Sequence, residues 1–113
     1  MTDTSRDTTT PRPDPASLTG LAEVRAGIDA IDGALLTLLA ERQAHVDRAA
    51  TLKAGAGIAA AAPARAAAVL ERVHHKAGQA GVDPHVAVAM WRVMIDHFIR
   101  REQATLGTTG EDA

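Results

Sequence analysis

The amino-acid sequence predicts an all-α fold with three helices in each chain, one long and two of medium length. Alanine accounts for 25 of the 113 residues, and a helix accommodates alanine better than any other residue. One Trp, one Phe and no Tyr leave few aromatic strand formers. Apolar residues recur every three or four positions along three segments, which is the spacing of an amphipathic helix. A core built from such small and medium side chains requires helices that approach one another closely.

The first predicted helix is long and runs from Leu18 to about Ala54, a stretch without proline. Thr19 is expected to cap its N-terminus. A helix of roughly 35 residues rises about 50 Å, which exceeds the diameter of a compact domain of this length. It must find partners along its whole length, and we expect some of them in a second subunit. Its apolar positions are Leu21, Val24, Ile28, Ile31, Leu35, Leu38, Leu39, Val46, Ala49 and Leu52.

A loop and a shorter helix are expected next. Gly55, Gly57 and the alanine-rich run to Pro63 interrupt the helical spacing and predict a loop. The second helix is expected over about residues 64–79. Gly81 is expected to end it, because glycine adopts the left-handed conformation of a helix C-terminus without strain.

The third helix has the clearest start signal in the sequence. Asp83 is a favoured capping residue and Pro84 fits the first helical position. The apolar spacing continues to about Leu106. We therefore expect a helical domain over residues 18–106, between a disordered N-terminal tail (1–17) and a frayed C-terminal tail (107–113).

Composition excludes several classes of function. A net charge of −2 provides no basic field for nucleic acid. The chain has no cysteine for disulfides or thiolate metal sites, and its five histidines lack the spacing of metal ligands. No apolar window is long enough for a membrane span, and residues 1–17 lack the apolar core of a secretory signal. We expect a cytoplasmic protein that holds no metal and binds neither nucleic acid nor membranes.

Three cations on the first helix have a spacing that suggests an anion site. Arg42 and Lys53 are 11 residues apart, so they project from nearly the same side about 16 Å from each other. Arg25 lies 17 residues before Arg42, about 25 Å away and about 100° around the helix. If all three serve one ligand, Arg25 must come from a second copy of the chain. Because cations on a long helix are usually solvated, spacing alone leaves both interpretations open.

The segment LTGLAEVRAGIDAIDGALLTLLAERQAHVDRAATLKA resembles the first helix of the all-helical chorismate mutase family. The pattern of that family is L-x-x-(I/V/L)-R-x-x-I-D-x-I-D, then L-L-x-L-L-x-x-R, then a Lys eleven residues after that Arg. The V-D-P-H-V stretch after Gly81 and the I-D-H-F-I-R-R-E-Q stretch of the third helix fit the same family. The resemblance covers about residues 18–106. The matching first-helix residues are Leu21, Val24, Arg25, Ile28, Asp29, Ile31, Asp32, Leu35, Leu36, Leu38, Leu39, Arg42 and Lys53.

This resemblance implies an intertwined homodimer in which each long helix spans both subunits. Arg25 matches the arginine that one subunit donates to the active site of its partner. Arg42 and Lys53 match the two cations that come from the same chain. Arg65 matches the arginine at the start of the second helix, and Glu102 matches a Gln or Glu near the ether oxygen of the substrate.

The implied substrate is a small dicarboxylate, chorismate or isochorismate, and the implied reaction needs no cofactor. Two arginines can each hold a carboxylate in bidentate geometry. The rearrangement of chorismate to prephenate depends on holding the reactive conformer and on donors at the breaking ether bond. Lys53 is one expected donor. Glu102 can be the other only when protonated, and burial favours that form whereas a nearby Lys53 opposes it.

Two positions depart from the family pattern. Ala66 stands where many mutases have a Glu that contacts the ring hydroxyl, and Phe98 stands where Ser or Thr is frequent. The first departure and the T-G-L-A opening are similar to isochorismate pyruvate lyases, although those enzymes have Gln at the position of Glu102. This chain also resembles the aminodeoxychorismate mutases, which have Glu at the position of Glu102 and a pattern like that of Ala66. Chorismate mutase is the leading prediction; isochorismate pyruvate lyase, 4-amino-4-deoxychorismate mutase and a non-catalytic helical dimerisation module are the alternatives.

Overall fold

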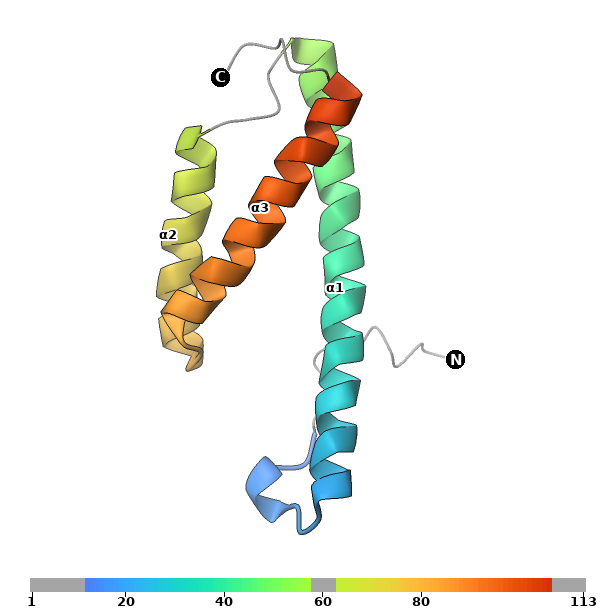
Figure 1. Ribbon diagram of the computed structural model, residues 1–113, viewed down its shortest axis with the longest axis vertical. Helices are drawn as coiled ribbons and strands as arrows, with labels where there is room; N and C mark the ends of the chain where they lie inside the picture. The colour runs from blue at the N-terminus through green and yellow to red at the C-terminus, as the bar shows by residue number, and fades with distance from the viewer. Residues whose placement is uncertain (1–11, 58–62, 107–113) are drawn as a thin grey trace. The chain divides into compact units, whose positions relative to one another are not determined.

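The computed structural model describes residues 12–57 and 63–106, and all regular structure in this part of the chain is helical (Figure 1). A 3-10 turn, η2 (Pro15–Ser17), precedes three α-helices. These are α1 (Leu21–Ala56), α2 (Pro63–Ala80) and α3 (Pro84–Leu106). The predicted class, all-α with one long and two medium helices, is confirmed. None of the helices in the described ranges has an apolar stretch long enough to cross a membrane.

At the N-terminus of α1, the cap lies one residue after the predicted cap, and the helix begins at Leu21 rather than at Leu18. The carbonyl of Gly20 accepts the first helical hydrogen bond, from the amide of Val24 at 3.2 Å. Gly20 therefore occupies the capping position, which tolerates glycine. The hydroxyl of Thr19, the expected cap, instead donates to the Glu23 carboxylate at 3.4 Å.

The C-terminus of α1 lies beyond the predicted start of the loop. Gly55 was expected in the loop, but it lies inside the helix, which ends at Ala56. A glycine within a helix costs only about 1 kcal/mol relative to alanine, too little to end a long helix by itself. The change of direction comes at Gly57, whose φ is +71°. The remainder of the predicted loop, residues 58–62, lies outside the described residues.

The turn between α2 and α3 confirms the predicted cap residues. Gly81 has a φ of +80°. Its amide donates to the carbonyl of Gly78 at 3.3 Å, and the amide of Val82 donates to the carbonyl of Ala77 at 2.9 Å. These two bonds are the Schellman pattern of a glycine-terminated helix. The turn reverses the chain, and Figure 1 shows α2 and α3 as neighbouring antiparallel helices.

The start of α3 is capped as the sequence indicates. The Asp83 carboxylate accepts a hydrogen bond from the amide of His85 at 2.9 Å, and the Asp83 carbonyl accepts from the amide of Ala87 at 3.0 Å. An amide that has no partner within the helix is thereby satisfied.

Part of the tails expected from the sequence can be described. Of the expected N-terminal tail, residues 1–11 lie outside the described residues, as does the expected C-terminal tail, 107–113. Next to α1, the Asp14 carboxylate accepts from the amide of Ala16 at 3.0 Å and starts the turn η2.

The chain divides into two units, Met1–His45 and Val46–Ala113, and α1 contributes to both. In the first unit, the large apolar side chains of α1 remain between 38% and 66% exposed. They recur at helical spacing and so form an apolar stripe along the helix. The residues of this stripe are Leu21, Val24, Ile28, Ile31, Leu35, Leu36, Leu38 and Leu39.

The second unit has a small interior made of small side chains. Its buried apolar residues in the described ranges are Ala50 of α1, Ala77 of α2 and Ala87 of α3. Alanine allows helix backbones to approach closely but removes little apolar surface from water. The expectation of a core of small side chains is confirmed here.

Replacing Gly81 with alanine should destabilise the chain by about 1 kcal/mol, because an L-residue is strained at this positive φ. A Cβ added at Gly81 would meet no atom within 4 Å, so the cost comes from the backbone conformation alone. The measurement is urea unfolding followed by circular dichroism.

Gly78→Ala is the matched control for this prediction. Its Cβ would make an ordinary contact with Pro84, 3.9 Å away, and alanine is favoured within a helix by roughly 0.5–1 kcal/mol. The control should therefore shift the unfolding midpoint upward. Equal shifts of the same sign in both variants would contradict the role assigned to Gly81.

Candidate functional site

The second unit contains a partly buried ion pair between α1 and α3. Lys53 lies in the last turn of α1, and its ammonium group donates to Oε2 of Glu102 at 2.8 Å. The Glu102 side chain is 9% exposed and that of Lys53 is 26% exposed. A carboxylate so far removed from water requires a cation or a proton. The two residues that sequence analysis assigned to the reacting part of the substrate thus lie in direct contact.

Helix periodicity explains why both side chains point inward. On α1, Ala50 is buried and lies one turn before Lys53, so this side of the helix faces the interior. On α3, the residues that share a face with Glu102 are at least half-buried. They are Trp91, Ile95 and Phe98, at the spacing of an inward helix face.

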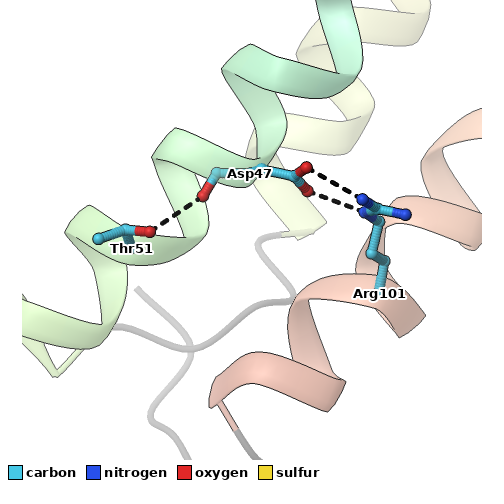
Figure 2. A network of polar contacts seen from close by, with 3 residues as sticks. All are labelled: Asp47, Thr51 and Arg101. Atoms are coloured by element: carbon cyan, nitrogen blue, oxygen red, sulfur yellow. Dashed lines mark hydrogen bonds and ion pairs between the residues drawn. The ribbon is translucent and has the colours of Figure 1, made fainter. Parts of the chain in front are cut away.

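A second ion pair joins the same two helices closer to solvent. The Arg101 guanidinium donates from Nε to Asp47 Oδ1 at 2.8 Å and from Nη2 to Asp47 Oδ2 at 3.0 Å (Figure 2). This bidentate arrangement fixes the orientation of both side chains. The side chains are 41% and 47% exposed for Arg101 and Asp47. Thr51, one turn after Asp47, donates its hydroxyl to the Asp47 carbonyl at 3.3 Å.

The Asp47 and Arg101 side chains shift each other's proton affinity. The hydrogen bonds from Arg101 lower the pKa of Asp47, and those to Asp47 raise the pKa of Arg101. Because the pKa of Asp47 is lowered on folding, the stabilisation from this pair is present above the ordinary aspartate pKa. It is lost as the pH falls through the lowered value. The pair is therefore intact throughout the neutral range.

The remaining predicted site residues are the three arginines. Arg25 is exposed and Arg42 half-buried, and both belong to the part of α1 in the first unit. Arg65 lies in the first turn of α2 with an exposed side chain. Among these candidates, the second unit brings Lys53 and Glu102 into contact.

Sequence reasoning missed Asp47 and Arg101. A signal was available, since Asp47 and Lys53 have opposite charges on α1, and Arg101 and Glu102 have opposite charges on α3. Each of these charged residues therefore has a residue of opposite charge on the other helix. That signal becomes informative only once the register of α1 and α3 is known.

The site offers donors and an acceptor rather than metal ligands. Lys53 supplies an ammonium donor, and Glu102 accepts when ionised and donates when protonated. In the ranges that the structure describes, no three residues of the His, Asp and Glu types lie close enough to hold a metal ion. The arrangement suits the stabilisation of charge that develops on an oxygen atom.

Comparisons with known proteins agree on one family. A family model described as chorismate mutase type II matches residues 24–103. A chorismate mutase from Methanocaldococcus jannaschii is 31% identical over 77 residues, which cover 68% of this chain and 78% of that protein. No solved structure matches the chain significantly. The matched segment contains Lys53, Glu102 and the three candidate arginines.

Proposed function

Because the chain belongs to the chorismate mutase type II family, we propose that it rearranges chorismate to prephenate without a cofactor. The observation that carries the proposal is the contact between Lys53 and Glu102 at 2.8 Å in a partly buried setting. These two residues match the family positions at the breaking ether bond. Residues 18–106 form the proposed catalytic domain.

Binding of the substrate is assigned to arginines. Arg42 and Arg65 of one chain and Arg25 of a second copy hold the two carboxylates of chorismate. Bidentate contacts of this kind fix the enolpyruvyl arm above the ring, in the conformer that reacts. Holding the substrate in this conformer lowers much of the activation barrier of the rearrangement.

Acceleration of the reaction itself is assigned to Lys53 and Glu102. The ether C–O bond breaks as a new C–C bond forms, the electrons move in one cycle, and no proton is transferred. Negative charge grows on the ether oxygen in the transition state, so donors placed there stabilise it. Lys53 is one donor. In the substrate-free chain Glu102 accepts from Lys53. In the proposed transition state Glu102 is protonated and donates to the ether oxygen, because an ionised carboxylate would repel that oxygen.

The proposed active assembly is an intertwined homodimer. Its support is the apolar stripe of α1, which one chain leaves between 38% and 66% exposed. A continuous apolar surface of this kind marks an interaction site. A second copy of α1 presents the same stripe, as a two-fold interface requires, and brings Arg25 to the neighbouring active site.

Isochorismate pyruvate lyase is the second candidate function, and one observation favours it. The half-buried Ala66 lies beside Arg65, where many mutases have a Glu that contacts the ring hydroxyl. A site without that carboxylate can accept a ring with its hydroxyl at another position. 4-Amino-4-deoxychorismate mutase follows from the same residue, and a non-catalytic dimerisation module is the remaining alternative.

Product analysis separates these candidates. The purified chain is incubated with chorismate, isochorismate and 4-amino-4-deoxychorismate in separate reactions, and products are identified by mass spectrometry. We expect prephenate from chorismate. Salicylate and pyruvate from isochorismate would replace the mutase with the lyase, and turnover of none of the three would leave the dimerisation module.

The donor role proposed for Glu102 is tested by replacing its side chain. Glu102→Gln should keep most of the mutase activity, measured as kcat/KM, because a side-chain amide can donate a hydrogen bond to the ether oxygen. Glu71→Gln, the same replacement at an exposed position on α2, is the matched control and should leave kcat/KM unchanged. A near-complete loss of activity in Glu102→Gln alone would contradict donation by this residue.

Donation of Arg25 across the dimer is tested by mixing two variants. Arg25→Ala and Lys53→Ala should each be nearly inactive. After unfolding together and refolding, half of the dimers are hybrids with one intact site, so activity should recover to about a quarter of that of the unmodified chain. No recovery would mean that Arg25 acts within its own chain. Full activity of both single variants would show that neither residue takes part.

A further inference from the structure

Two ion pairs of opposite polarity connect α1 to α3. On α1, the anion Asp47 precedes the cation Lys53 by six residues, whereas on α3 the cation Arg101 precedes the anion Glu102. Asp47 holds Arg101 near the surface, and Lys53 holds Glu102 in the interior. One pair is a bidentate fork in partial contact with solvent, and the other is a partly buried single hydrogen bond.

This alternation of charge favours one register. Successive residues of a helix point about 100° apart, so Arg101 and Glu102 contact different partners on α1. A rotation or slide of α3 that moved Arg101 toward Lys53 would bring two cations together. One that moved Glu102 toward Asp47 would bring two carboxylates together. Repulsion between like charges raises the free energy of both alternative arrangements. The four residues therefore favour the observed register of α1 and α3.

Among the described residues, few side chains around this contact are fully buried, although Phe98, one turn before Glu102, is half-buried. In the described ranges, the buried apolar residue of α1 is Ala50, and the buried residue of α3 near its C-terminus is Glu102 itself. A methyl group interlocks little with its surroundings, so it restricts helix rotation weakly. Exposed ion pairs add little stability, but a guanidinium fork defines direction as well as distance. Asp47 and Arg101 therefore contribute little to stability and chiefly fix the orientation of α3 relative to the end of α1.

We propose that Asp47 and Arg101 are positioning residues, which set the rotation of α3 so that the Glu102 carboxyl group meets Lys53. Neither residue contacts the reacting atoms. The effect on turnover rests on the proposed function, but the effect on the contact between Lys53 and Glu102 does not. The two effects can be measured separately.

The first arm of the test observes the Lys53 ammonium group directly. In the chain labelled with ¹⁵N, a hydrogen-bonded ammonium exchanges its protons slowly enough to give a resolved NMR signal. We expect that signal in the unmodified chain, and we expect Asp47→Asn and Arg101→Gln to broaden it beyond detection. Arg100→Gln removes a neighbouring exposed cation of α3, and Asp96→Asn an exposed carboxylate; both controls should keep the signal. An unchanged signal in Asp47→Asn would overturn the proposal whatever the activity.

The second arm measures turnover. Asp47→Asn and Arg101→Gln should lower kcat on the order of tenfold with little change in KM, because a displaced donor weakens transition-state stabilisation rather than carboxylate binding. Their melting temperatures should stay within about 2 °C of the unmodified chain, as expected for an exposed pair. A loss of activity that tracked a large fall in melting temperature would contradict a positioning role.

Reversing the pair provides the rescue. Asp47→Arg combined with Arg101→Asp restores opposite charges across the two helices, so kcat should return to within about threefold of the unmodified chain. The Lys53 signal should return with it. Failure of both to recover would overturn the proposal. If the unmodified chain turned over no substrate, the proposed function would fail, and the NMR arm would still decide this inference.

Discussion

A carboxyl group with almost no access to water needs a cation beside it or a proton on it, and in the second unit a cation meets that need. Glu102 is 7% exposed, and the ammonium of Lys53 lies 2.8 Å from it. The desolvation that makes this contact costly also makes it selective, because removing either charge leaves the other unbalanced. The end of α1 and the end of α3 therefore have to meet at these two residues. Under the proposed function, this is also where the charge that acts on the substrate is placed.

Alanine makes such polar contacts more important than they are in an ordinary core. Large side chains of neighbouring helices usually interlock and fix rotation as well as distance. Here Ala50, Ala77 and Ala87 permit the helices to approach closely, but their methyl groups are too small to interlock with a neighbouring helix. Direction then comes from hydrogen bonds, which are the Lys53 and Asp47 pairs between α1 and α3 and the Schellman turn between α2 and α3. The turn and the ion pairs thus add direction to the packing of the half-buried side chains of α3.

Local signals in the sequence predicted most of the fold. The Asp83-Pro84 start and the Gly81 end of neighbouring helices depend on the conformational preferences of single residues, so they could be read directly. Gly55 misled the prediction because a glycine penalty is small against the cooperativity of a 36-residue helix.

For the candidate site, sequence offered less. Lys53 and Glu102 were assigned through their match to a family pattern, and the structure shows that the two side chains are in contact. Asp47 and Arg101 are 54 residues apart, and their pairing depends on the rotation of two helices, which no local spacing encodes. Tertiary register is thus the quantity that sequence periodicity left undetermined. The same limit applies to Arg25 and Arg65, whose assignment rests on family resemblance.

The alanine interior also determines how this chain can change over time. A buried alanine can become smaller only as glycine, so every other substitution is an enlargement, and an enlargement pushes a helix aside. Near Ala50, that displacement would separate Lys53 from its partner on α3. Sequence drift at such a position would alter the chemistry of the site before it unfolded the protein. Selection on the interior and selection on the site would therefore be difficult to tell apart in this chain.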